Sequence, residues 1–201
     1  MKSRLVIFAI VSSIATACSE QPSPPAPVDP LLGTWKSNCI EGQLRTFTAP
    51  VRFGITEHSE MTFENEKVVE VSRVTSSSCE GNDVEITASG TYKKEGFSNP
   101  NVLPIDVRFD SYKVKPVTEF GVKVMNPGKW CGIDDWTLGV ERDVTNQIGK
   151  ENCFPASTHF TVHAVEGESL YFGERENATS SSKRPQDLKK DLTYTRLPNK
   201  S

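Results

Sequence analysis

The sequence lacks the signatures of the common catalytic and nucleotide-binding classes. It contains no nucleophile elbow, P-loop, H-E-x-x-H motif or dinucleotide fingerprint. Lys and Arg number 23 against 26 Asp and Glu, so the clustered positive charge that nucleic-acid binding requires is missing. The apolar run from Leu5 to Ile14 is shorter than the about 20 residues that a transmembrane helix needs. We therefore expect no enzymatic activity, no cofactor or metal, and no nucleic-acid partner.

The N-terminus has the anatomy of a secretory signal peptide. Lys2 and Arg4 form a positively charged region, the apolar run follows, and small residues precede Cys18. The stretch that ends in Cys18 resembles a bacterial lipobox, in which a diacylglyceryl group is attached to the cysteine thiol before cleavage on its N-terminal side. Ordinary signal cleavage after Ala15-Thr16-Ala17 would cut the same bond. The cysteine count favours lipidation, because five cysteines in an exported chain leave one unpaired.

Lipidation of Cys18 implies a domain tethered to a membrane. We expect residues 1–17 to be removed as the signal peptide, residues 18–30 to form the lipidated cysteine and a stiff proline-rich tether, and residues 31–201 to form one domain. Without Lys2 and Arg4 the chain has 21 basic and 26 acidic residues, a net charge of −5. Ser19 after the cysteine resembles lipoproteins of the outer membrane, which implies a bacterial envelope protein that faces the periplasm.

The remaining cysteines predict two disulfide bonds, which export permits. Four cysteines allow three connectivities. We favour Cys39 with Cys79 and Cys131 with Cys153, because pairing of sequence neighbours fits a meander in which consecutive strands are adjacent. The alternative is a zinc site or a redox pair, but the C-x-x-C spacing usual for those roles is absent.

Several segments alternate apolar and polar residues with the period of a strand. The clearest are Val84–Ser89 and Ile105–Asp110, and weaker alternation occurs at residues 61–63, 67–74, 159–165 and 192–197. Turn-forming residues separate these segments. The best helix candidate is the short segment Thr118–Asn126, with Thr118 as its N-cap. The sequence therefore predicts an all-β, antiparallel sandwich or barrel with at most one short helix.

The first predicted strand carries a structural motif. Gly33-Thr34-Trp35 resembles the G-x-W opening of lipocalin-like barrels, in which the tryptophan closes one end and an arginine of the last strand packs across it. The resemblance implies that Arg196 packs over the Trp35 ring. Such a cation–π contact contributes about 0.5–2 kcal/mol, depending on burial. We assign Gly33, Trp35 and Arg196 a structural role.

A second resemblance covers residues 32–197. Its motifs are Gly33-x-Trp35-x-Ser37-x-Cys39, Cys79, Gly90-Thr91-Tyr92, Pro116-x-Thr118-Glu119, Asn126, Cys131-Gly132-x3-Trp136-x2-Gly139, Asp143-Val144-Thr145, Cys153, Leu170-Tyr171-Phe172-Gly173 and Arg184-Pro185. This series is similar to the adenomatosis polyposis coli down-regulated (APCDD) domain, and its cysteine–tryptophan block is the most specific part. The family has lipocalin-like, half-open antiparallel barrels whose apolar interior accepts an acyl chain.

This resemblance implies a lipid-binding barrel, with palmitate as a typical ligand. The chain differs from animal members by its single domain copy, its N-terminal lipid in place of a C-terminal membrane helix, and the lack of a proline after Cys79. The family is best known from an animal membrane glycoprotein that antagonises Wnt signalling. Because of these differences the resemblance does not imply a Wnt partner here, and the protein partner is unknown. The candidate lining residues lie on apolar strand faces: Ile86, Val107, Phe109, Phe160 and Val162. The alternative is that they form an ordinary core.

Two other functions compete with ligand binding. The first is an interaction module that binds an envelope protein or glycan through its loops, suggested by Trp130 and Trp136 near a predicted disulfide. In the structural alternative, Trp136 plugs one barrel end. The second is a hydrolase or isomerase that uses Asp134, Asp135 or His163. Adjacent residues of an extended segment point to opposite faces, which argues against an acid pair at Asp134 and Asp135.

Overall fold

The computed structural model describes residues 29–41, 56–76, 78–96, 102–150, 152–154, 158–173 and 180–198. The predicted signal peptide, Cys18 and the predicted tether up to residue 28 lie outside the described residues. The described strands are β1 (Gly33–Ser37), β2 (Ile40–Glu41), β3 (Thr56–Glu64), β4 (Lys67–Thr75), β5 (Val84–Lys94), β6 (Leu103–Pro116), β7 (Arg142–Asp143), β8 (Thr158–Glu166), β9 (Ser169–Gly173) and β10 (Leu188–Arg196). The helices are α1 (Glu119–Met125) and the short 3-10 turns η1 (Trp130–Gly132), η2 (Thr145–Gln147) and η3 (Ser181–Lys183).

The strands form one antiparallel sheet that closes into an eight-stranded barrel. The order around the barrel is β1-β10-β9-β8-β6-β5-β4-β3, and pairing of β1 with β3 closes the ring. α1 begins after Thr118, whose hydroxyl accepts a hydrogen bond from the Gly121 backbone N at 3.2 Å. The prediction of an all-β, antiparallel, lipocalin-like barrel with at most one short helix is confirmed. The barrel was predicted to be half-open, but pairing of β1 with β3 closes it.

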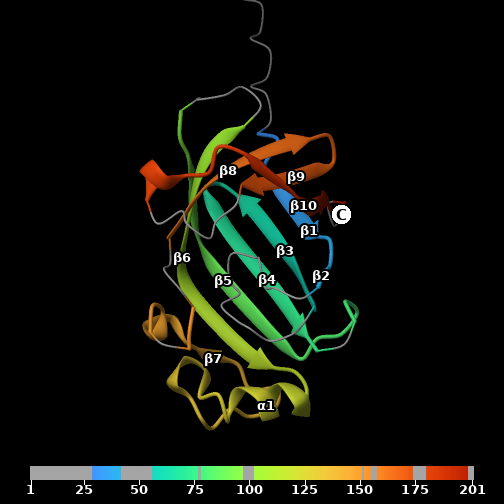
Figure 1. Cartoon of the computed structure of the whole chain (residues 1–201), viewed down its shortest axis with the longest axis vertical. Coiled ribbons are helices and arrows are strands. Elements are labelled where there is room, and N and C mark those ends of the chain that lie inside the picture. Colours follow the sequence, from blue (N-terminus) through green and yellow to red (C-terminus); the bar gives the residue numbers. More distant parts are fainter. Residues whose placement is uncertain are drawn as a thin grey trace, which may run out of the picture.

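Only part of β6, the longest strand, takes part in the closed ring. β8 pairs only with Leu103–Arg108, the first part of β6, and the short β7 pairs with β6 at Lys113 and Val114. The sheet of β3, β4, β5 and β6 therefore continues past the ring toward α1, as Figure 1 shows. We call this continuation the extension, and define it by β3 residues 56–61, β4 residues 70–75, β5 residues 84–88 and β6 residues 112–116.

Strand register shows which side chains share the inner face. We call each set of directly paired residues across β3, β4, β5 and β6 a rung. From the ring toward the end of the extension, the rungs are Phe63/Val68/Gly90/Phe109, Met61/Glu70/Ala88/Tyr112, Ser59/Ser72/Ile86/Val114 and Glu57/Val74/Val84/Pro116. The opposite face carries ion pairs, such as Arg73 with Glu60 at 3.0 Å. This division into a buried and a wet face produces the period-two pattern of the sequence.

A β-bulge keeps the inner face continuous along β5 and β6. Ser89 pairs with Ser111, whereas the next residue, Gly90, pairs with Phe109, so β6 carries one extra residue. A Cβ atom on Gly90 would lie only 1.9 Å from the Arg108 carbonyl oxygen. Glycine is therefore required where the two backbones approach this closely.

Side chains fill the closed part of the ring. Its largest buried residues are aromatic, and neighbouring rings meet edge to face: Phe63 and Tyr92 have centroids 5.1 Å apart, and Phe172 and Tyr194 have centroids 5.6 Å apart. Trp35, Phe63 and Tyr194 are at most 1% exposed. This half of the barrel is a packed core of interlocking rings.

Both predicted disulfide bonds are present. Cys39 pairs with Cys79, and Cys131 pairs with Cys153. The first joins the β1–β2 connection to the turn before β5, and the second holds the segment after α1 together. They close loops with sequence separations of 40 and 22 residues, for which chain-entropy models give about 3–4 kcal/mol each. The predicted connectivity is thus confirmed.

Candidate ligand-binding site

Three of the predicted lining residues share the inner face. Ile86, Val107 and Phe109 are at most 1% exposed. Ile86 belongs to the extension, whereas Val107 and Phe109 point into the part of the barrel that side chains already fill. Of the predicted set, only Ile86 therefore faces the extension.

Phe160 and Val162 lie on the outer face of the sheet. The prediction that these two residues line the interior is therefore wrong. They pair with Asp106 and Pro104, whereas the inner-facing Val107 pairs with His159. Asp106 points away from the barrel interior, where its carboxylate accepts a hydrogen bond from Arg184 at 2.7 Å. The outer face of β8 is apolar because the chain near Pro185 covers it, next to Gly173 and Val162.

The inner face of β8 carries two histidines instead. His163 is 2% exposed, and its Nδ1 donates to the Leu103 carbonyl oxygen at 3.0 Å. Burial lowers the pKa of His163 to about 4, so the imidazole is neutral at pH 7. The His159 ring packs 6.0 Å from Phe109. Among the residues that the structure describes, no three His, Cys, Asp or Glu side chains are grouped as a metal site.

The inner face of the extension is amphipathic. Apolar side chains of Ile86, Val74 and Val84 alternate there with Ser72 and Glu70, which are both 0% exposed. Two valines of β4, Val69 and Val71, face the other way, which is why the valine-rich sequence of this strand did not reveal Glu70 and Ser72 as inner residues.

Polar contacts continue from this surface onto the neighbouring strands. The Ser59 backbone N donates to Ser37 Oγ at 2.8 Å, and the Ser59 hydroxyl donates to the Tyr194 hydroxyl oxygen at 3.4 Å. Burial, together with the negative charge of Glu70, raises the pKa of Tyr112, so this phenol stays protonated and able to donate. The extension thus offers both apolar area and hydrogen-bonding groups.

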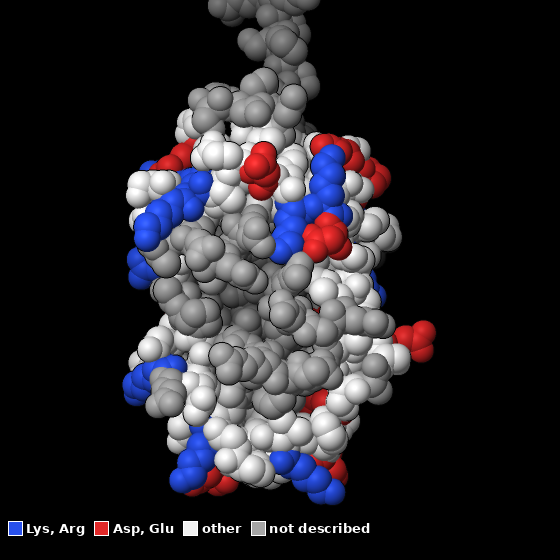
Figure 2. Space-filling view, viewed as in Figure 1, with Lys and Arg blue, Asp and Glu red and all other residues white. Residues whose placement is uncertain are grey.

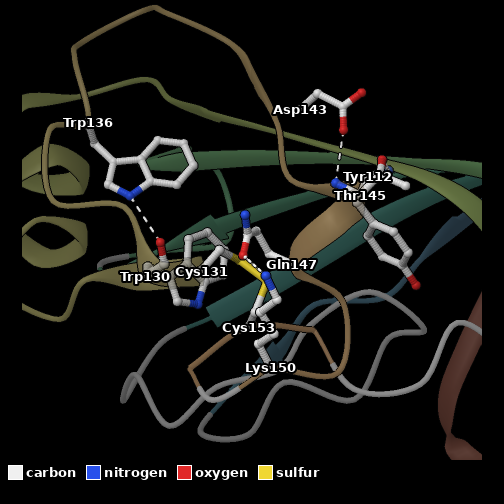
Figure 3. The surroundings of a disulfide bond; sticks show 9 residues. All are labelled: Tyr112, Trp130, Cys131, Trp136, Asp143, Thr145, Gln147, Lys150 and Cys153. Carbon is white, nitrogen blue, oxygen red and sulfur yellow. Dashed lines mark hydrogen bonds between the residues drawn. A yellow bond between two sulfur atoms is a disulfide. The ribbon is translucent and has the colours of Figure 1, made fainter.

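The disulfide-bonded segment after α1 packs against the end of the extension. Asn126 holds Trp136 through two bonds, accepting from its backbone N at 2.6 Å and donating to its carbonyl oxygen at 3.1 Å. The Trp136 indole Nε1 donates to the Trp130 carbonyl oxygen at 3.3 Å, next to the Cys131–Cys153 bond (Figure 3). Trp136 is 2% exposed, so it belongs to the core of this segment.

A series of aromatic rings links this segment to the inner face. The Trp130 ring lies 5.5 Å from Phe154, and Phe154 stacks on Tyr112 at 4.7 Å. The backbone N of Tyr112 donates to Thr145 Oγ1 at 2.9 Å (Figure 3), and the Val144 backbone N donates to the Tyr112 carbonyl oxygen at 2.9 Å. Tyr112 is therefore shared between the sheet and the disulfide-bonded segment.

The other barrel end is closed by the residues of the G-x-W motif. The Arg196 guanidinium carbon lies 4.1 Å from the centroid of the Trp35 ring. Gly33 has a φ of 116°, in the region that glycine adopts without strain. The described chain begins at this end, with Asp29 and Pro30, and α1 lies at the opposite end (Figure 1).

The two adjacent acidic residues belong to separate ion pairs. Asp135 accepts from Arg142 at 2.8 Å, and this hydrogen bond lowers the pKa of Asp135. The Asp134 carboxylate lies 3.7 Å from Lys129 Nζ. On the face in Figure 2, basic and acidic side chains of the described residues are interspersed, so these residues present no large field of one sign.

No protein-family model matches the sequence, and the comparison with curated proteins gives no match. In the described part of the chain, every helix is too short or too polar to cross a membrane. The structure itself therefore defines the class, which is a disulfide-bonded, antiparallel β-barrel closed by eight strands.

Proposed function

We propose that this protein is a lipid-anchored protein of the bacterial envelope whose barrel binds one acyl-chain ligand at the inner face of the extension. The observation that supports this proposal is the contrast between the two halves of the barrel. Aromatic side chains fill the ring, whereas the extension combines apolar residues with buried hydroxyl and carboxyl groups. A surface of this kind suits a ligand with an apolar chain and a polar head.

The energetics favour an acyl chain over a compact polar ligand. Each methylene buried against Ile86 and its neighbours would contribute about 0.8 kcal/mol. Eight buried methylenes would thus provide about 6 kcal/mol, before the cost of association is subtracted. The serines and Tyr112 would then fix the orientation of the polar head.

Lipidation of Cys18 would also orient the binding surface. The described chain begins at the Trp35 end, whereas the extension lies toward α1 (Figure 1). β6, a strand of 14 residues, spans roughly 45 Å at the rise of an extended strand. A membrane anchor at the N-terminus would therefore hold the Trp35 end near the outer membrane and present the extension to the periplasm.

Binding can be tested on the purified full-length lipoprotein. Native mass spectrometry after mild extraction should detect a co-purifying lipid, and isothermal titration should detect binding of methyl dodecanoate. Ile86→Trp, which fills the inner face, should abolish binding. Val69→Trp places the same side chain on the exposed outer face of the neighbouring strand and should bind normally.

Circular dichroism and thermal melting show whether each variant folds. If Ile86→Trp fails to fold, Ile86→Phe provides a smaller obstruction and should weaken binding. Absence of both a co-purified lipid and a titration signal from the wild-type protein would contradict the proposal.

A second candidate function is recognition of a protein partner at the α1 end. It is favoured by three large apolar residues that are 44–47% exposed there: Phe120, Leu138 and Val140. The loop with Leu138 and Val140 is fixed, because the Gly139 backbone N donates to the Pro116 carbonyl oxygen at 2.8 Å. Leu138→Asp should abolish cross-linking to an envelope partner while the fold persists. Trp136→Ala is unsuitable for this test because it removes a buried ring.

A further inference from the structure

The three tryptophans differ in what their indole N–H groups contact. Trp35 Nε1 donates to the Leu31 carbonyl oxygen at 2.8 Å, and Trp136 Nε1 donates to the Trp130 carbonyl oxygen at 3.3 Å. Trp130 Nε1 is buried and has no hydrogen-bond partner among the residues that the structure describes. A buried donor left unsatisfied costs about 1–3 kcal/mol, and such groups are rare enough to require an explanation.

Two successive ring contacts link Trp130 to the proposed binding surface. The residue is 5% exposed, and its ring contacts Phe154, which stacks on the inner-face residue Tyr112. The adjacent Cys131 is bonded to Cys153, and the Trp130 carbonyl oxygen is held by Trp136. The indole is therefore fixed in place without the use of its own N–H group, as a pre-organised binding group would be.

We propose that the Trp130 indole N–H is the polar anchor of the ligand, and that it donates to the carbonyl oxygen of an acyl ester or amide. This inference rests on the proposed function and narrows the class of ligand. A neutral indole cannot compensate a full negative charge. The rungs of the extension contain the carboxyl groups of Glu57 and Glu70 and no Lys or Arg among the described residues. Neutral acyl esters and amides are therefore favoured over fatty-acid anions.

Indole N–H signals in a 15N–1H correlation spectrum provide a direct test. Trp130→Phe assigns the signal by its disappearance. Titration with methyl dodecanoate should move the Trp130 signal downfield as a hydrogen bond forms, whereas the Trp35 and Trp136 signals stay in place. Tridecane, which has no acceptor, should bind without the downfield shift, and sodium dodecanoate should bind more weakly than the ester.

The Trp130→Phe variant separates a ligand anchor from a structural role. It should bind methyl dodecanoate about tenfold more weakly, the effect of one hydrogen bond worth about 1.4 kcal/mol, while its affinity for tridecane stays unchanged. Its melting temperature should fall less than that of Trp136→Phe: both variants lose part of a buried ring, but the Trp130 donor has no partner among the described residues, so no hydrogen bond is lost with it. Trp136→Phe is the matched control and should melt at a lower temperature, because its N–H has a partner.

The outcomes distinguish this inference from the function on which it rests. If methyl dodecanoate binds the wild type but the Trp130 signal stays in place, the anchor is wrong and the proposed function stands. Tighter binding of sodium dodecanoate than of the ester would overturn the preference for a neutral head. A melting temperature of Trp130→Phe as low as that of Trp136→Phe would show a structural role for the Trp130 N–H. If no probe binds, the proposed function itself fails.

Discussion

The Arg196 guanidinium lies over the Trp35 ring at 4.1 Å from its centroid, and it also donates to the carbonyl oxygens of Leu32 and Pro30 at 2.6 Å each. One side chain thus fastens the beginning of the described chain to the last strand of the barrel. The Trp35 indole donates to the Leu31 carbonyl oxygen of the same segment. This end of the barrel is closed by hydrogen bonds to the backbone as much as by packing.

Arg196→Ala should therefore lower the free energy of unfolding by about 2 kcal/mol, from the lost cation–π contact and two carbonyl groups left without their donor. Arg196→Lys should retain little of that energy, because an ammonium group cannot span both carbonyls as the planar guanidinium does. Urea unfolding measures both effects. The control is Arg108→Ala, whose exposed partner is Asp110 and which should change stability by less than about 0.5 kcal/mol. Equal losses at both positions would contradict a stabilising role for the Arg196 contacts.

The close approach of β5 and β6 at the bulge predicts that Gly90 cannot be replaced without a loss of stability. Gly90→Ala places a methyl group where the Arg108 carbonyl oxygen lies, so the two strands must separate, and we expect a loss of about 3 kcal/mol. Gly96→Ala is the matched control, because a Cβ atom there meets nothing within 4 Å. Thermal melting of the two variants gives the comparison. A Gly90→Ala protein as stable as Gly96→Ala would show that the bulge tolerates a side chain.

Sequence alone predicted the strands with clear alternation of apolar and polar residues, and the pairing of the four cysteines. Val84–Ser89 and Ile105–Asp110 are clean alternating segments, and they lie within β5 and β6. The pairing of cysteines that are neighbours in sequence was also correct. The meander argument did not foresee, however, that the Cys131–Cys153 bond lies outside the sheet, in the segment between α1 and β8.

The features that were missed depend on which face of a strand the barrel encloses. In β8 the apolar Phe160 and Val162 face outward and the histidines face inward, because a distant segment around Pro185 covers the outer face. Alternation reveals two faces but cannot say which one is inside. The unsatisfied Trp130 N–H leaves no trace in a sequence, since it depends on which acceptors surround the folded ring.

The buried His163 predicts how stability depends on pH. Its pKa is about 4 in the folded protein, against 6.5 for an ordinary histidine, so the unfolded chain binds the proton more readily. The stability that the neutral imidazole contributes is present above pH 6.5 and is lost as the pH falls toward 4, by about 3 kcal/mol in total. Asp29 and Asp83 have pKa values lowered from 3.8, so their contribution is lost at lower pH.

Urea midpoints at pH 7.5, 5.5 and 4.5 measure this effect. His163→Gln keeps a side-chain donor for the Leu103 carbonyl and removes the titrating group, so its midpoint should change less over this range than that of the wild type. His58→Gln is the comparison, because burial also lowers the pKa of His58, so any share of the acid sensitivity that comes from His58 is lost in that variant and retained in His163→Gln. If His163→Gln has the same pH profile as the wild type, the acid sensitivity originates elsewhere.

The lipid anchor can be separated from the fold by comparing cysteine variants. Cys18→Ser should move the protein from the membrane fraction to the soluble periplasmic fraction, with both disulfide bonds retained, since the two bridges use the other four cysteines. The double variant Cys39→Ser/Cys79→Ser should do the opposite: it should stay in the membrane fraction and lose about 4 kcal/mol of stability. Fractionation of cells, thiol counting and urea unfolding measure the three properties. Cys18→Ser protein that still sediments with membranes would show that the association does not depend on a lipid at this cysteine.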